Sequence, residues 1–431
     1  MRILMVSWEY PPLIYGGLGR HVHGLAEGLA AAGHNVVVVT QAGPTTTNDT
    51  MTGGVRVVRV LPDPPARSMT DDFLTWVLAL NTALGRAGEA VARSFRPDVV
   101  HAHDWVSAHA GVGVAHAIGA PLVATVHATE AGLWNGWLST PLSRARHDVE
   151  GWLAAEAARV IVCSAAMQVE VSAAFDLAAD TLDVIPNAVD VATWRTSAEQ
   201  QRVLRHRLGI ADDAPLLVVA GRLEWEKGGD VAIEALARVR RQHSSARLVI
   251  AGAGSQEPAW RALARRRRVA RAVTLCGHLD DRDLPALLAT ADVALVPSSY
   301  EPFGMVALEA AAAGTPVVAG DTGGLREVVE DGGTGLLVPP RDPAAIATAT
   351  LRLLDDPELG ARLLAAARSQ LTERFSWPVV ARATTHVYAA AGLDPRPPRP
   401  RPAPVPDGNV LAGRPRSVRD AWRDVRSGPP P

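Results

Sequence analysis

The sequence predicts an α/β protein with two doubly wound, Rossmann-like domains and a C-terminal tail rich in proline and arginine. Three observations lead to this prediction. Short apolar strand candidates alternate with helix-like segments, which is typical of a parallel sheet covered on both faces. This alternation stops and restarts near the middle of the chain, and the last forty residues differ in composition. A chain of 431 residues is also long enough for two domains.

Six runs rich in β-branched residues predict the strands of the first domain. They are residues 2–7, 35–40, 55–60, 97–102, 121–126 and 159–164. Alanine- and leucine-rich segments between them predict helices over 18–32, 71–94 and 105–118. We expect this domain to span residues 1–190, with a C-terminal helix over 376–391 packing back on it.

The same alternation predicts a second domain over residues 197–375, and we interpret residues 185–200 as the linker. Its strand candidates are residues 215–221, 246–252, 272–277, 291–297, 315–320 and 334–339. Ligands of doubly wound sheets bind at the carboxyl ends of the strands. We therefore expect the two domains to face each other across a ligand-binding cleft.

Composition narrows the class of protein. A hydrophobic content of 48% and a charged content of 20% are typical of a globular protein with a large core. The net charge of -2 gives no argument for nucleic acid as a partner. Cys163 and Cys276 lie in apolar runs, which predicts reduced core residues. Glu9 interrupts the short apolar N-terminus, so we expect no signal peptide and a cytoplasmic protein.

Residues 392–431 predict a largely disordered tail, because they hold eleven of the 32 prolines and eight arginines. Inside it, apolar residues recur at helical spacing over residues 413–428 and arginines fill the other positions. One interpretation is a helix that docks on the protein itself or stays frayed. The other is a basic amphipathic helix that rests on a partner or on the inner face of a membrane. The sequence does not indicate an oligomeric state.

Two cations follow a predicted strand in "AGRLEWEKGGD" (residues 220–230). Arg222 stands at the end of the strand, and Lys227 stands five residues later, near the start of a helix. Arginine grips phosphate oxygens with a bidentate fork, and lysine supplies a compact charge. The pair therefore predicts a diphosphate site, with two solvated surface cations as the alternative.

The segment "SYEPFGMVALEAAAAGTPVV" (residues 299–318) adds a helix N-terminus to these cations. The helix opens at Gly304, and the backbone N–H groups of Gly304, Met305 and Val306 are suited to bind an anion. Glu309 is the only charged residue inside this apolar helix, where a carboxylate is costly without a partner. The combination predicts that Glu309 accepts hydrogen bonds from ribose hydroxyls.

The first domain offers the glycine-rich stretch "EYPPLIYGGLGRHV" (residues 9–22) directly after its first strand. Gly17 and Gly19 allow close approach of the backbone to a ligand. The stretch is not G-x-G-x-x-G, and the strand ending at Thr40 and Gln41 lacks the acid that holds an NAD ribose. "GRLEWEKG" also lacks the end of a P-loop. A dehydrogenase and a P-loop NTPase are both disfavoured.

The motifs "GGLG", "HAHDW", "TVHATE", "GRLEWEKG" and "EPFGMVALE" together resemble the retaining glycosyltransferases of family 4, over about residues 2–391. Within that family the chain is most similar to glycogen and starch synthases and to actinobacterial α-1,4-glucosyltransferases. The resemblance implies a GT-B fold and transfer of a hexose, above all glucose, from a nucleotide diphosphate sugar such as UDP- or ADP-glucose. It implies an α-glucan or oligosaccharide acceptor, and neither a cofactor nor a metal ion.

The resemblance also implies roles for residues of the second domain. Arg222 and Lys227 match the pair that stabilises the leaving diphosphate. Glu309 matches the residue that binds the ribose, and Glu301 the residue that binds the donor sugar. The resemblance also implies front-face attack with retention of configuration. No carboxylate of the chain is well matched to a covalent nucleophile.

In the first domain the resemblance implies roles for four residues. His127 matches the histidine beside the donor sugar, and Asp104 matches an aspartate of the acceptor side. Gly17 and Gly19 match the glycine loop that closes over the phosphates. The chain departs from the K-x-G-G-L-G-D pattern of glycogen synthases at two positions, which are treated next.

Ile14 stands at the lysine position of that pattern and Arg20 at its aspartate position. These departures leave open the base of the donor, the sugar and the acceptor. A mannosyl- or other hexosyltransferase with a lipid-linked or small acceptor is an alternative, and a UDP-sugar 2-epimerase of the same fold is another. A non-catalytic carbohydrate-binding protein would not need the two cations. A pyridoxal phosphate-dependent phosphorylase shares the fold.

Two further groups have competing interpretations. His101, His103 and Asp104 have a spacing that permits metal binding, but no cysteine or glutamate cluster accompanies them. We expect no metal site there, and a packing role for His103. Trp134 and Trp137 predict either a wall for stacking sugars or an aromatic anchor of a loop.

Overall fold

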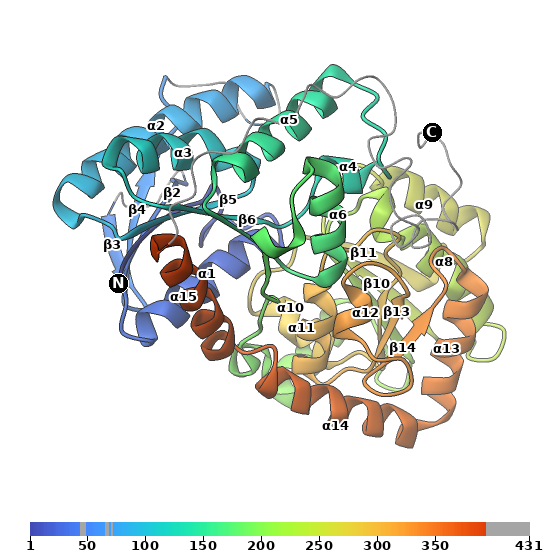
Figure 1. Ribbon diagram of the computed structural model, residues 1–431. Coiled ribbons are helices and arrows are strands. Elements are labelled where there is room, and N and C mark those ends of the chain that lie inside the picture. Colours follow the sequence, from blue (N-terminus) through green and yellow to red (C-terminus); the bar gives the residue numbers. More distant parts are fainter. Residues whose placement is uncertain (44–48, 65–68, 70–71, 394–431) are drawn as a thin grey trace. The chain divides into compact units, whose positions relative to one another are not determined.

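The computed structural model describes residues 1–43, 49–64, 69 and 72–393, and these residues form two compact units (Figure 1). Among the described residues, the first unit holds Met1–Asn187 together with residues 377–393, and the second holds Ala188–Ser376. The second unit thus begins at Ala188 rather than at residue 197. The helix expected over residues 413–428 lies outside the described residues.

The first unit contains an eight-stranded sheet with the order β3-β4-β2-β1-β5-β6-β7-β8. Its strands are β1 (Arg2–Val6), β2 (Asn35–Gln41), β3 (Asp49–Thr52), β4 (Val55–Val60), β5 (Val99–His103), β6 (Leu122–Val126), β7 (Arg159–Val162) and β8 (Leu182–Val184). Neighbouring strands are parallel except for β3 and β4. The central strand β1 is buried on both faces, since Ile3, Leu4, Met5 and Val6 are fully buried.

The helices of the first unit are α1 (Gly17–Ala31), α2 (Phe73–Phe95), α3 (Ala108–Ile118), α4 (Glu130–Leu133), α5 (Pro141–Glu156), α6 (Ala165–Phe175) and α15 (Trp377–Leu393). Short 3-10 turns lie at Trp105–Ser107 and Ala179–Thr181. Helix α15, the last described element, packs on α1. The contact is close, because a Cβ atom at Gly24 would lie 2.0 Å from Cε2 of Trp377.

The second unit contains a six-stranded parallel sheet with the order β11-β10-β9-β12-β13-β14. Its strands are β9 (Leu216–Ala220), β10 (Arg247–Ala251), β11 (Val273–Gly277), β12 (Val293–Val296), β13 (Val317–Gly320) and β14 (Leu336–Val338). Its helices are α7 (Ala198–Arg207), α8 (Gly229–Val239), α9 (Glu257–Arg266), α10 (Asp283–Ala289), α11 (Met305–Ala313), α12 (Leu325–Val328), α13 (Pro343–Asp355) and α14 (Pro357–Glu373). Short 3-10 turns lie at Val191–Trp194, Trp225–Lys227 and Ala270–Ala272.

The core of the second unit lies between its sheet and the helices α8, α9 and α13. Val293 and Leu295 of β12 join side chains of these helices in one buried cluster. Ala294 and Val296 are also buried and alternate with them along the strand. Both faces of the sheet are therefore covered, as a doubly wound fold requires.

The predicted fold class is confirmed, because both units are parallel-sheet, Rossmann-like domains. Every strand that the sequence predicts is present, and the structure adds β3 and β8. Among the helices of the described chain, none has the length and apolar character needed to cross a membrane.

Candidate active site

In the second unit, the segments that follow two neighbouring strands are joined by hydrogen bonds to the carboxylate of Glu301. Strands β9 and β12 are paired in parallel, so the segments after them leave the same edge of the sheet. Lys227 donates from Nζ to Oε2 of Glu301 at 2.8 Å, and Ser298 donates from Oγ to the same oxygen at 3.0 Å. Lys227 and Glu301 thus form a mostly buried ion pair across 74 residues of sequence.

Glycines hold the backbone at both ends of this ion pair. Gly228 has φ 68°, and a Cβ atom there would lie 2.2 Å from the carbonyl oxygen of Pro297. Gly323 has φ 47°, and its Cβ atom would lie 2.2 Å from the carbonyl oxygen of Glu301. Any larger residue at either position would push the two segments apart. The backbone positions of Lys227 and Glu301 therefore depend on these two glycines.

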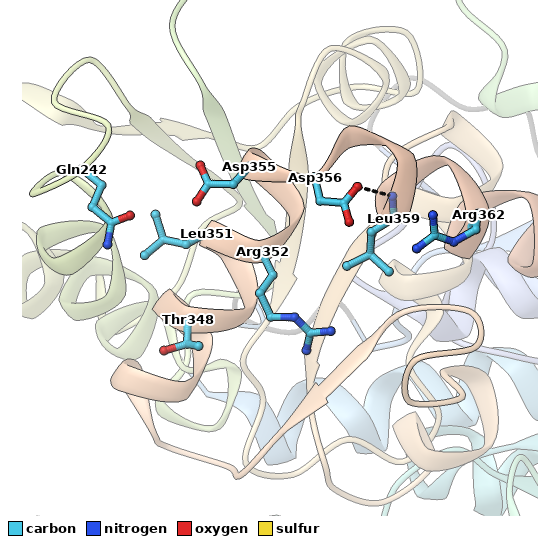
Figure 2. A pocket seen from close by; sticks show the side chains of 8 residues that line it. All are labelled: Gln242, Thr348, Leu351, Arg352, Asp355, Asp356, Leu359 and Arg362. Carbon is cyan, nitrogen blue, oxygen red and sulfur yellow. Dashed lines mark hydrogen bonds between the residues drawn. The ribbon is translucent and has the colours of Figure 1, made fainter.

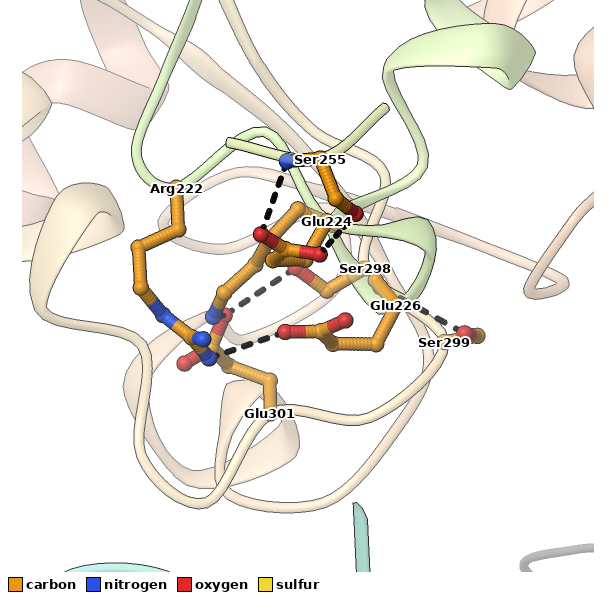
Figure 3. Close-up of polar contacts among 8 residues, drawn as sticks. Arg222, Glu224, Glu226, Ser255, Ser298, Ser299 and Glu301 are labelled. Carbon is orange, nitrogen blue, oxygen red and sulfur yellow. Dashed lines mark hydrogen bonds and ion pairs between the residues drawn. The ribbon is translucent and has the colours of Figure 1, made fainter. Parts of the chain in front are cut away.

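Arg222 has a partner that the sequence did not predict. Its Nη2 atom donates to Oε1 of Glu226 at 2.9 Å, and Figure 3 shows this contact beside Glu301. Glu226 is 2% exposed, and its carbonyl oxygen accepts the backbone N–H of Ser299 at 2.8 Å. The Arg222 side chain is 52% exposed. Its guanidinium carries five N–H donors, so donors remain for a second acceptor.

A second contact anchors the turn that carries both cations. The Glu224 carboxylate accepts the backbone N–H of Ser255 at 3.0 Å and its hydroxyl at 2.6 Å (Figure 3). Ser255 follows β10, the neighbour of β9 in the sheet. The turn at residues 221–228 is therefore tied to the segments after β10 and β12. Glu224 and Glu226 both lie in "GRLEWEKG". Two glutamates spaced two residues apart between Arg222 and Lys227 were the sequence signal that could have indicated partners for the cations.

Helix α11 presents an N-terminus without a side-chain cap. It begins at Met305, and its N-cap residue Gly304 has φ 110° and no capping side-chain hydrogen bond. A Cβ atom at Gly304 would lie 2.6 Å from Cδ2 of Leu325, so the position requires glycine. The backbone N–H groups of Met305 and Val306 belong to the first turn, where no helical acceptor exists. Glu309 lies one turn further on and is 1% exposed.

The first unit places Asp104 at the carboxyl end of β5 in a strained conformation. Its φ of 58° is unusual for a residue with a side chain. Its Oδ1 atom accepts the backbone N–H of His127, which follows β6, at 2.7 Å. Burial raises the pKa of Asp104 to about 7; the His127 N–H lowers it, and the negative charge of Glu9 raises it further. The structure thus brings two of the four predicted residues of this unit, Asp104 and His127, together.

His127 belongs to a buried group of histidines. Its Nε2 atom lies 3.2 Å from Nδ1 of His103. His101 contacts the hydroxyls of Tyr388 and Thr125, each at 2.7 Å. Burial lowers the pKa of His103 and His127 well below the usual value, and it holds the pKa of His101 at about 3. These imidazoles are therefore neutral near pH 7.

The sequence did not single out His21, the fourth member of this group. It lies on α1, and its ring stands edge to face with His127 at a centroid separation of 4.8 Å. Nitrogen atoms of His21, His103 and His127 all lie within 4.8 Å of one another, a spacing at which they could share a metal ion. No sequence spacing could have indicated this, because the three residues come from different elements.

The glycine-rich segment is fixed by a buried carboxylate. Oε2 of Glu9 accepts the backbone N–H groups of Tyr15 and Gly16 at 2.9 and 3.1 Å. Gly17 and Gly19 lie in the first turn of α1 rather than in a separate loop. A Cβ atom at Gly19 would lie 3.0 Å from Oε2 of Glu9. Gly19 therefore packs closely against a residue of its own segment, and its approach to a ligand stays a prediction.

Aromatic rings line the same edge of the first sheet. Trp8, after β1, stacks on Tyr15 at a centroid distance of 5.2 Å, and Tyr15 is 44% exposed. Trp105 follows β5 and meets the edge of Phe73 at 5.7 Å. Trp134 donates from Nε1 to Oε1 of Glu130 at 2.9 Å, which favours the loop-anchor interpretation for that residue.

A surface groove of about 550 Å³ on the second unit lies apart from the predicted site residues (Figure 2). Its lining residues are Gln242, Thr348, Leu351, Arg352, Asp355, Asp356, Leu359 and Arg362. They come from α13, α14 and the segment after α8. None of the predicted site residues lines this groove.

The chain has two doubly wound domains. In the second, two cations and a helix N-terminus lie near the ends of the strands. These features are typical of GT-B glycosyltransferases. Residues 200–370 match the family described as "Glycosyl transferases group 1". Residues 15–193 match the family described as "Glycosyltransferase Family 4". The chain belongs to these glycosyltransferases and is an enzyme, as the sequence motifs indicate.

Relatives cover almost the whole chain. The glycogen synthase of Mycobacterium tuberculosis is 48% identical over 410 residues, which cover 93% of this chain and 97% of that protein. The D-inositol 3-phosphate glycosyltransferase of Xylanimonas cellulosilytica is 34% identical over 411 residues, with coverages of 90% and 97%. Among solved structures, the sucrose-phosphate synthase of Thermosynechococcus elongatus superimposes with a TM-score of 0.75 at 26% identity, covering 90% of this chain and 98% of that one.

Proposed function

We propose that this enzyme transfers glucose, with retention of configuration, from UDP- or ADP-glucose to an α-glucan or oligosaccharide. The observation that carries the reaction type is the ion pair of Lys227 and Glu301 at the strand ends of the second unit. The similarity to a glycogen synthase supports glucose as the sugar and glucan as the acceptor.

Cleavage of the bond between sugar and diphosphate builds negative charge on the leaving group. We assign its stabilisation to Lys227 and Arg222, which carry fixed positive charges, and to the uncapped N-terminus of α11. The backbone N–H groups of Met305 and Val306 supply that helix contact. Because these groups are held by the protein before reaction, little reorganisation is needed as the charge develops.

We assign sugar and ribose recognition to the two glutamates. Glu301 already accepts hydrogen bonds from Lys227 and Ser298, so its carboxylate is oriented for additional hydroxyl donors. Glu309 is almost fully buried on α11, where a ribose hydroxyl would compensate for the loss of hydration. The two residues lie on one segment, eight positions apart, on either side of Gly304.

For the first unit we propose the roles that the family resemblance implies. His127 serves the donor sugar, Asp104 serves the acceptor, and Gly17 and Gly19 serve the phosphates. The hydrogen bond from the His127 backbone to Asp104 supports a common function for these two residues. The exposed ring of Tyr15 offers a flat face on which an acceptor sugar can stack.

We further propose that transfer requires neither a metal ion nor an organic cofactor. Lys227, Arg222 and the positive end of α11 supply the charge that a divalent cation supplies in other transferases. The donor sugar nucleotide is then a substrate and the only nucleotide that the reaction needs.

A second candidate is transfer to a small phosphorylated acceptor, which the similarity to a D-inositol 3-phosphate glycosyltransferase favours. Arg20, where the glycogen synthase pattern has an aspartate, adds a positive charge in the first turn of α1. This candidate keeps the donor chemistry and changes only the acceptor.

The deciding experiment is a donor screen with UDP-, ADP- and GDP-sugars against maltooligosaccharides and small acceptors. We expect release of nucleotide diphosphate and a product one glucose longer with an α-linkage. Transfer of mannose but not glucose would overturn the sugar assignment. Release of UDP without an acceptor, together with a changed free sugar, would identify an epimerase.

A further inference from the structure

The three histidines His21, His103 and His127 are an anomaly for a protein interior. His21 and His103 are 3% and 0% exposed. Within the described part of the chain, neither ring nitrogen of His21 has a partner in strict hydrogen-bond geometry, although the ring interacts with the Asn187 side chain. Buried polar atoms are otherwise almost always paired, so such a group indicates an ion or water that the side chains serve.

The geometry points to a Zn²⁺ site formed by His21, His103 and His127, and we propose that Zn²⁺ bound there inhibits the enzyme. The facing atoms Nδ1 of His103 and Nε2 of His127 are 3.2 Å apart. Two nitrogens bound to a tetrahedral Zn²⁺ at about 2.0–2.1 Å would be separated by roughly 3.3 Å. This pair therefore has the spacing of two zinc ligands without movement of the backbone.

The third ligand, His21, completes the set from a different element. One nitrogen from each of the three residues lies within 4.8 Å of the other two. Helix α1, the end of β5 and the segment after β6 each contribute one histidine. Three neutral imidazoles with one open position are a donor set that Zn²⁺ prefers over Mg²⁺ or Ca²⁺.

The Asn187 side chain lies beside His21 and interacts with its ring, outside strict hydrogen-bond geometry. Oδ1 of Asn187 is buried and, within the described residues, has no partner in hydrogen-bond geometry. An amide oxygen beside His21 is suited to accept a hydrogen bond from a water molecule on the fourth position of zinc.

Inhibition follows from the position of His127. Zinc would occupy Nε2 of His127, and this residue is the one that we assign to the donor sugar. The metal therefore acts against transfer and is not required for it. Binding is measured without donor or acceptor, so the test of the site does not depend on the proposed function.

The primary experiment measures Zn²⁺ binding to the full chain, after removal of any histidine tag, by competition with a chromophoric chelator. We expect one tight Zn²⁺ per chain. His21→Ala and His103→Ala should each weaken binding by at least about 100-fold, beyond the 10–100-fold effect of residues that only contact a ligand. His23→Ala is the matched control, because His23 lies on the same helix and pairs with Glu27 instead.

Substitution of Co²⁺ for Zn²⁺ provides a measurement that does not depend on the folding of the variants. Wild-type protein and the His23→Ala variant should both give the intense visible absorption of tetrahedral Co²⁺. A weak octahedral spectrum, or Zn²⁺ binding that His21→Ala leaves unchanged, would overturn the site. Tight binding without loss of glucosyl transfer would overturn the inhibition.

Discussion

Nζ of Lys227 and Oε2 of Glu301 lie 2.8 Å apart, so the cation assigned to the diphosphate and the carboxylate assigned to the sugar form one ion pair. The pair joins the segments after β9 and β12, which are neighbours in the sheet. Substitution of either residue therefore leaves the other without its charge partner. The predictions for this site take that coupling into account.

Lys227→Ala should lower kcat/KM, because it removes a positive charge that stabilises the leaving diphosphate. The expected loss of transition-state stabilisation is about 2–4 kcal/mol. Steady-state release of nucleotide diphosphate measures this effect. Arg202→Ala is the control, since Arg202 forms an exposed pair with Glu199 on α7. Turnover near the wild-type rate in a folded Lys227→Ala protein would remove the lysine from the mechanism.

Arg222→Ala should cause a loss of transition-state stabilisation in the same range, about 2–4 kcal/mol. It should also lower the stability of the protein, because the buried Glu226 carboxylate loses the arginine as its partner. Arg222→Lys should not restore the rate fully, because lysine lacks the planar fork that binds two phosphate oxygens. Equal kinetics for the lysine variant and the wild type would show that only the charge matters.

Much of this architecture is predictable from the sequence. The strands appear as apolar runs because parallel strands buried on both faces need them, and β1 with its four fully buried side chains is the clearest case. Strand β3 was missed because Asp49–Thr52 is an exposed edge without an apolar pattern. It pairs with β4 through an antiparallel ladder, and Asp49 and Thr50 also bond to the side chains of Arg56 and Arg59. None of these contacts produces an apolar pattern in the sequence.

Side-chain partners were the less predictable part of the site. The order Arg222, Lys227, Glu301 and Glu309 predicted a donor site, but it did not predict that Glu226 holds Arg222. Such partners depend on distances across turns, which motif spacing does not encode. His21 illustrates the same limit, since it meets His127 only because the ring on α1 reaches the segment that follows β6.

Glu309→Gln should mainly weaken nucleotide binding, by about 1–3 kcal/mol, because an amide is a poorer acceptor for ribose hydroxyls than a carboxylate. Calorimetric titration with UDP and ADP measures the change directly. Glu358→Gln, exposed in the first turn of α14, provides a comparison outside the proposed site. A variant that binds the diphosphate normally and loses only turnover would contradict the ribose assignment.

Chelation should leave glucosyl transfer intact. The cations at residues 222 and 227 and the end of α11 are proposed to supply the positive charge, so EDTA removes nothing that the reaction needs. The measurement is the initial rate after dialysis against EDTA, with and without added Mg²⁺ or Mn²⁺. Complete loss of activity that returns with either ion would show that a metal is part of the transfer site.

Glu150→Gln should change how stability depends on pH. Glu150 lies on α5, is 4% exposed, and accepts the backbone N–H of Glu130 with both carboxylate oxygens at 3.0 and 3.1 Å. Burial raises its pKa well above the usual value; the Glu130 N–H lowers it, and the negative charges of Glu130, Asp104 and Glu170 raise it further. The folded protein therefore keeps a proton that the unfolded chain releases.

The sign of the effect follows from this difference in bound protons. Below the unfolded pKa both states are protonated and the contribution of Glu150 to stability is complete. As the pH rises towards the folded pKa, only the unfolded chain loses its proton, and the free energy of unfolding falls by up to about 1.4 kcal/mol for each pH unit. Glutamine stays neutral and keeps an oxygen for the Glu130 N–H, so the variant should lack this loss.

Urea unfolding followed by circular dichroism at pH 5, 6.5 and 8 measures the effect. We expect Glu150→Gln to be more stable than the wild type at pH 8, with a difference that shrinks as the pH falls to 5. The exposed Glu89 on α2 supplies the control, because Glu89→Gln changes the same charge at a solvated position. A Glu150→Gln protein that is less stable than the wild type at pH 8 would show that the carboxylate is ionised in the folded state and stabilises the start of α4.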